Sequence, residues 1–147
     1  FFIIPLFFSS CSSKNVIYNI NKKPSSFYYT NKLMENIKLN KINKCSAFEM
    51  NYYKEIEIDT DNFNKVCTFF NKLNTSNFIA PPNDIPSKPK YMIFFTSDDG
   101  KFIANIYNEK YISVYPWDGS YEMDFIDISS ISNSNNIYEL CNFLYSL

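Results

Sequence analysis

The chain has 147 residues, of which 46% are hydrophobic and 19% aromatic, and its formal net charge is −1. This length predicts a single domain, and the aromatic side chains are numerous enough to fill a sizeable core. Because acidic and basic residues balance, the surface lacks the positive charge that nucleic-acid binding requires, so no nucleic-acid partner is expected.

The absent residue types exclude several classes of enzyme. All 14 basic residues are lysine, and histidine, arginine and glutamine do not occur. Without histidine, neither a Ser-His-Asp triad nor a Cys-His pair can form. The two glycines, Gly100 and Gly119, are too few for a glycine-rich loop that binds phosphate. We therefore expect no cofactor and no metal, and a binding module rather than an enzyme.

The first 26 residues resemble the leader of a bacterial lipoprotein. Residues 1–10 are mostly apolar, and we interpret them as the end of a truncated signal peptide. Phe8-Ser9-Ser10-Cys11 matches the lipobox pattern of Leu, two small residues and Cys, except that Phe replaces Leu. The match predicts lipidation of the Cys11 thiol, with residues 11–26 as a flexible tether. The alternative is a buried N-terminal strand with an ordinary cysteine.

Lipidation of Cys11 would anchor the protein to the outer face of the cell membrane. Two or more acyl chains anchor stably, because each buried CH₂ group contributes about 0.8 kcal/mol. No later apolar run approaches the roughly 18 residues of a membrane span, so no second membrane segment is expected.

Residues 27–147 are predicted to form one globular domain that begins with a helix and an extended segment. Apolar residues recur at helical spacing over residues 27–39. Over residues 43–58 they alternate with polar residues. This alternation predicts one long strand, or a hairpin kinked near Asn51, with Phe48 on the core-facing side.

A second helix and an irregular connector are predicted next. The helix begins at Asp59 or Thr60, either of which can cap it. Its apolar stripe consists of Phe63, Val66, Cys67, Phe70 and Leu73. Residues 74–89 carry four prolines and are therefore predicted to be a stiff connector without regular structure.

From residue 90 the pattern predicts a meander of short strands and a closing helix. The expected strands are residues 91–97, 101–107, 110–115 and 121–128, and the expected helix is residues 132–147. Asp98-Asp99-Gly100 is typical of a hairpin turn. The expected fold class is α+β, a two-layer domain with an antiparallel meander sheet of four to five strands and two or three helices packed mainly on one face.

Three features together resemble a known group of proteins. They are the lipobox, the proline-rich connector and the segment NEKYISVYPWDG, and the resemblance covers most of residues 27–147. The chain is similar to an uncharacterised family of short clostridial lipoproteins, a domain of unknown function. The resemblance implies a Gram-positive, extracytoplasmic lipoprotein and attaches no activity to it.

An aromatic cluster is the first candidate site. Tyr107, Tyr111 and Tyr115 share one strand parity and are expected to face away from the helices, near Trp117 and Tyr121. Such a surface would bind a glycan or a peptide, because aromatic rings offer a large contact area at low entropic cost. The alternative is that the tether, the proline-rich connector or the first helix covers this face.

An acidic cluster is the second candidate site. Asp118, Glu122, Asp124 and Asp127 flank the tryptophan turn. Paired carboxylates can hydrolyse a glycoside by acid–base chemistry. The spacing matches no calcium loop, and aspartate in turns is ordinary backbone chemistry.

The remaining cysteines leave two alternatives open. Cys67 and Cys141 lie on apolar faces of the predicted helices, and a disulfide between them is compatible with an extracytoplasmic location. The alternative is that Cys45, Cys67 and Cys141 are three buried free thiols.

The leading functional interpretation is a non-enzymatic, membrane-tethered binding or interaction module of the cell envelope. Its partners, besides the membrane that holds the lipid anchor, would be a wall polymer, a peptide or an envelope protein. The alternatives are a small hydrolase that uses Asp and Glu, and an inhibitor or sensor lipoprotein that acts on another envelope protein.

Overall fold

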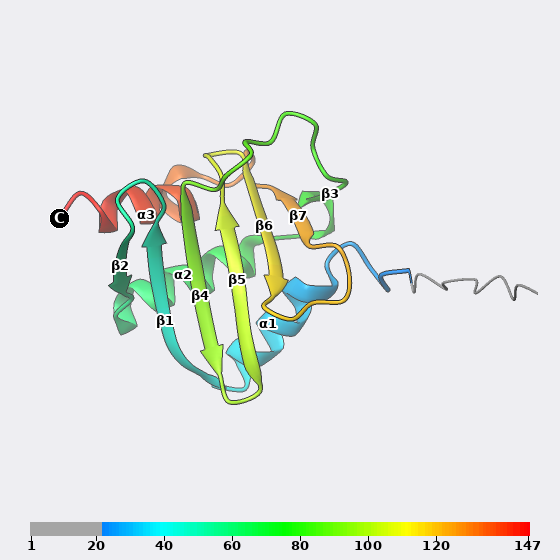
Figure 1. Ribbon diagram of the computed structural model, residues 1–147, viewed down its shortest axis with the longest axis horizontal. Coiled ribbons are helices and arrows are strands. Elements are labelled where there is room, and N and C mark those ends of the chain that lie inside the picture. The colour runs from blue at the N-terminus through cyan, green and yellow to red at the C-terminus, as the bar shows by residue number, and fades with distance from the viewer. Residues whose placement is uncertain (1–21) are drawn as a thin grey trace, which may run out of the picture.

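A computed structural model describes residues 22–147 and shows one sheet with helices on one side (Figure 1). The strands are β1 (Ile42–Glu49), β2 (Lys54–Glu57), β3 (Phe78–Ile79), β4 (Tyr91–Ser97), β5 (Gly100–Ile106), β6 (Tyr111–Pro116) and β7 (Asp124–Asp127). The helices are α1 (Tyr28–Lys38), α2 (Thr60–Lys72) and α3 (Ile137–Leu144), with short 3-10 turns η1 (Thr75–Asn77) and η2 (Asn133–Asn135). The predicted signal peptide, Cys11 and most of the predicted tether lie outside the described residues.

The predicted α+β class is confirmed, but the predicted strand number is wrong. The sheet has seven strands, all antiparallel, in the order β2-β1-β4-β5-β6-β7-β3. The sheet has two more strands than the upper limit of the prediction. Residues 43–58 form a hairpin, the second of the two predicted alternatives, and β3 lies within the proline-rich connector, where its two residues pair with β7.

The core lies between the sheet and the three helices. Leu33 of α1, Phe69 of α2 and Cys141 of α3 are buried against strand residues such as Ile93 and Ile112. In Figure 1 the helices lie behind the sheet, so the face toward the viewer carries no helix. We call this second side the helix-free face.

Helix α2 illustrates how the local sequence specifies an element. Asp59 caps it, since its Oδ1 accepts a hydrogen bond from the backbone N–H of Asn62 at 2.8 Å. Val66 and Phe70 are buried as expected, and Phe69 is buried as well. Phe63 is only half-buried, because the stripe that contacts the sheet is rotated from the predicted one.

The β1–β2 hairpin reverses the predicted facing of its residues. Cys45 and Ala47 belong to the core on the helix side, so Phe48 lies on the helix-free face. Tyr53 in the turn has a φ of 52°, a left-handed conformation that helps to reverse the chain. The alternation over residues 43–58 therefore predicted strands correctly, but it assigned the wrong side of β1 to the core.

The register of the central strands places two aromatic residues on the helix-free face, one on each side of a buried isoleucine. Phe94 of β4 pairs with Ile103 of β5, and Ile103 pairs with Tyr115 of β6. At the end of this row, the backbone N–H of Trp117 donates to the carbonyl of Lys101 at 2.8 Å. The tryptophan is therefore held beside β5 at the edge of the open face.

Candidate binding surface

The helix-free face contains a hollow of about 420 Å³ over β2, β1, β4 and β5. We call it the sheet-face hollow, and its lining includes Lys44, Phe48, Glu55, Phe94, Lys101 and Trp117. Aromatic rings from three separate chain segments converge there because the register of the sheet brings Phe48 and Phe94 to the same face. The arrangement combines flat apolar surfaces with charged groups of both signs.

The ammonium group of Lys101 lies between two of these rings. Its Nζ is 5.7 Å from the ring centroid of Phe94 and 5.9 Å from that of Trp117. Cation–π attraction holds the lysine against both rings. Trp117 is 70% exposed, so most of its indole surface faces solvent and is available for contact.

A second hollow of about 460 Å³ lies between α1, the β4–β5 turn and the loop after β6. We call it the α1 groove, and its lining includes Tyr28, Tyr29, Lys32, Lys101, Asp118 and Tyr121. Lys101 lines both hollows, so the two are neighbours.

The wall of the α1 groove is a cluster of three tyrosines. The Tyr29 hydroxyl accepts a hydrogen bond from the backbone N–H of Tyr121 at 2.7 Å. The rings of Tyr28 and Tyr121 meet edge to face with centroids 5.6 Å apart. Contact with Tyr28 also raises the pKa of Lys32, whose Nζ lies 4.5 Å from the Tyr28 ring. The groove therefore presents aromatic surface beside a protonated lysine.

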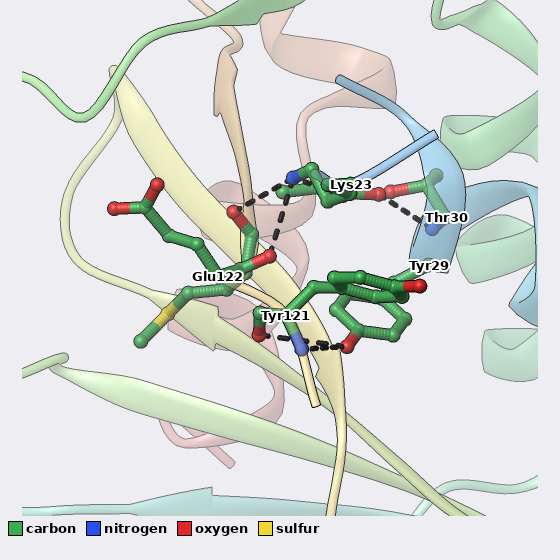
Figure 2. A network of polar contacts seen from close by, with 7 residues as sticks. Lys23, Tyr29, Thr30, Tyr121 and Glu122 are labelled. Atoms are coloured by element: carbon green, nitrogen blue, oxygen red, sulfur yellow. Dashed lines mark hydrogen bonds and ion pairs between the residues drawn. The ribbon is translucent and has the colours of Figure 1, made fainter. Parts of the chain in front are cut away.

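Beside this groove, Asp124 is fixed by two residues from the start of the domain, Lys23 and Thr30, which Figure 2 labels. Its side chain has no exposed surface, and its Oδ1 lies 2.8 Å from the Nζ of Lys23. The backbone N–H of Thr30 donates to its Oδ2 at 2.7 Å. Lys23 Nζ also donates to the backbone carbonyls of Glu122 and Met123, each at 3.2 Å. Both oxygens of this carboxylate are thus engaged in holding α1 and the preceding segment onto β7.

The rest of the predicted acidic cluster does not converge on a shared point with Asp124. Asp127 Oδ1 accepts from the backbone N–H of Ser129 at 2.9 Å, an ordinary turn contact. Asp118 and Glu122 are exposed in the loop between β6 and β7. Among residues 22–147, no group of three or more Cys, Asp or Glu side chains is arranged to hold a metal ion.

The structure distributes the predicted aromatic residues over three places. Tyr111 is only 6% exposed, and its hydroxyl donates to Asp84 of the proline-rich connector at 2.9 Å. Tyr107 contacts Ser113 at this same covered end, and Tyr115 is half-buried on the helix-free face. Tyr121 lies in the α1 groove, and Trp117 borders the sheet-face hollow.

Local sequence patterns did not indicate several of the residues that line the two hollows. Phe94 was recognisable in principle, because the Asp-Gly hairpin turn fixes its pairing with Ile103. Tyr28 and Tyr29 belong to a predicted helix, but their approach to Tyr121 depends on contacts 92 residues apart in the chain. No local pattern signals such a contact.

The three cysteines of the described domain are free thiols. Cys67 belongs to α2 and Cys141 to α3, and these helices contact each other. Burial raises the pKa of the Cys141 thiol to about 12 and that of Cys45 still further. Both thiols are therefore protonated at neutral pH and behave as small apolar side chains.

The fold defines a small α+β domain in which one face of an antiparallel sheet is covered by helices and the other carries the sheet-face hollow with its aromatic lining. The chain belongs to the family described as domain of unknown function (DUF4883), which it matches over residues 23–141. Within residues 22–147, no helix has the length and apolar character needed to cross a membrane.

A solved structure shares this fold. It is described as "Putative Lipoprotein from Clostridium perfringens", is 30% identical in sequence and superposes with a TM-score of 0.75. The similarity covers 85% of this chain and 99% of that one. The predicted resemblance to short clostridial lipoproteins is thereby confirmed. No curated protein sequence matches the chain.

Proposed function

We propose that this protein is a lipid-anchored binding module on the outer face of a Gram-positive cell membrane, and that it acts without catalysis. The clostridial relative described as a lipoprotein supports the anchor, and so does the sequence Phe8-Ser9-Ser10-Cys11. Lipid on Cys11 would tether the domain while leaving its surfaces free for a wall polymer, a peptide or another envelope protein.

The sheet-face hollow is the observation that carries the binding proposal. Phe48, Phe94 and Trp117 present rings on a face that no helix covers, and Lys44 and Lys101 supply hydrogen-bond donors beside them. Ligand sites combine apolar and aromatic surface with a few polar groups in this way. The engagement of Asp124 with Lys23 and Thr30 argues against the alternative of a hydrolase built on that residue.

Tryptophan fluorescence tests the proposal directly, because Trp117 is the only tryptophan in the chain. Soluble peptidoglycan fragments should shift its emission in a saturable manner, since a bound ligand replaces water at the indole. Phe48→Ala should weaken the response, whereas Phe143→Ala, on the helix side and 49% exposed, is the matched control. Unchanged emission at millimolar ligand would count against the proposal.

The anchor has its own test. Cells that express the protein should incorporate labelled palmitate into it, and Cys11→Ala should abolish the label because the acylated thiol is gone. Globomycin should block processing of the unaltered chain. Label that persists in Cys11→Ala would show that the protein is held at the membrane in some other way.

A further inference from the structure

We propose that the ligand is a linear oligosaccharide that runs from the sheet-face hollow, past Trp117 and Lys101, into the α1 groove. This inference rests on the proposed binding function and specifies its substrate class. It makes one extended site out of the two hollows on either side of the loop after β6.

The two hollows are neighbours that share one lining residue. Lys101 lines both of them, and Trp117 borders one while its neighbours Pro116 and Asp118 border the other. Each hollow, at about 420 and 460 Å³, lies toward the small end of the roughly 300–1,000 Å³ range of small-molecule sites. A chain-like ligand exploits both, whereas a compact ligand would leave one of them empty.

The chemistry along this path suits a sugar polymer. Phe48, Phe94 and Trp117 provide rings at one end, and the half-buried Tyr28 and Tyr121 provide them at the other, with the buried Tyr29 behind them. Rings of this kind pack against the flat apolar faces of pyranose units with little loss of side-chain entropy.

The charges along the path also favour hydroxyl-rich, nearly neutral ligands. Lys44 and Glu55 flank the rings of the sheet-face hollow, and Lys32 and Glu35 flank those of the α1 groove. Sugar hydroxyls can donate to the carboxylates and accept from the ammonium groups. With the other charged lining residues included, the path carries three lysines and four carboxylates, so a strongly charged polymer of either sign meets several like charges.

An extended peptide fits this path less well. Peptides that bind along a sheet usually add a strand at an open edge, where unpaired backbone groups are available. The edges here are β2 and β3, whereas the sheet-face hollow centres on the inner strands β1, β4 and β5. Recognition along this path therefore depends on side chains, as it does for sugars.

The length dependence of binding tests the inference. Calorimetric titration of the full chain with N-acetylglucosamine oligomers should show affinity rising about tenfold or more from the dimer to the hexamer, because only the longer chain reaches both hollows. Trp117→Ala should weaken the binding of both the dimer and the hexamer. Lys32→Ala, at an exposed position of α1, should reduce hexamer affinity toward that of the dimer and leave the dimer unaffected.

The outcomes separate this inference from the proposed function. Equal affinity for dimer and hexamer, or a hexamer affinity unchanged in both Lys32→Ala and Tyr121→Ala, would overturn the extended path while binding at Trp117 stands. Binding of an acidic or neutral peptide in place of every oligosaccharide would overturn the sugar class. Binding of neither, and no response to peptidoglycan fragments, would overturn the proposed function as well.

Discussion

At the scale of single residues, the ion pair between Lys23 and Asp124 joins the start of the described chain to β7. Asp124 is fully buried, and Lys23 is its cationic partner although 101 residues separate the two in the chain. Nothing in the local sequence distinguishes Lys23 from the other lysines of the predicted tether. Its role therefore could not be predicted, because it follows from where β7 comes to lie beside α1.

We expect Lys23→Ala to lower the free energy of unfolding by about 2 kcal/mol, because the substitution leaves a buried carboxylate without its cation. The loss stays below that of a fully buried pair because Lys23 is partly exposed. Urea unfolding measures it, with Lys22→Ala at the exposed neighbouring position as the matched control. Equal stability of the two variants would show that the ion pair contributes nothing.

At the scale of elements, local signals predicted local features well. The Asp59 cap and the Asp-Gly turn between β4 and β5 both act within four residues, and both were found as predicted. The facing of β1 was predicted wrongly because both sides of the sheet carry apolar residues, Cys45 on one and Phe48 on the other. Alternation identifies a strand, but it cannot tell a helix-covered face from an open aromatic one.

The packing of β1, α2 and α3 around the thiols makes a prediction about pH. Burial keeps Cys45 and Cys141 protonated in the folded state, whereas in the unfolded chain they ionise near the ordinary pKa of 9.0. Their contribution to stability is therefore complete below pH 9 and falls as the pH rises above it, by up to about 1.4 kcal/mol per pH unit for each thiol.

Urea unfolding between pH 8 and pH 11 measures this loss. The double variant Cys45→Ala and Cys141→Ala should show a shallower decline than the unaltered domain, whatever its stability at neutral pH. Thiol labelling of the chain that carries Cys11→Ala provides the control, since Cys67 should react before the two buried cysteines and three thiols should be counted after denaturation. Parallel pH profiles for the two proteins would contradict the account.

At the scale of the whole molecule, the fold separates the first described residues from the sheet-face hollow, while the α1 groove lies next to them. The first described residues run beside β7 and α1, while the sheet-face hollow lies over β1, β4 and β5 (Figure 1). If Cys11 is lipidated, residues 12–22 reach at most about 40 Å from the membrane. The domain would therefore meet polymers of the inner wall with its helix-free face unobstructed by its own tether.

Sedimentation with purified cell walls is the most direct measurement of the central claim, that the helix-free face is the binding surface. The unlipidated chain, carrying Cys11→Ala, should sediment with the walls, and adding Trp117→Ala should leave most of it in the supernatant because the exposed ring is lost. The same chain with Phe143→Ala should sediment as before. Equal sedimentation of the Trp117 and Phe143 variants, or no sedimentation of any of the three proteins, would contradict the claim.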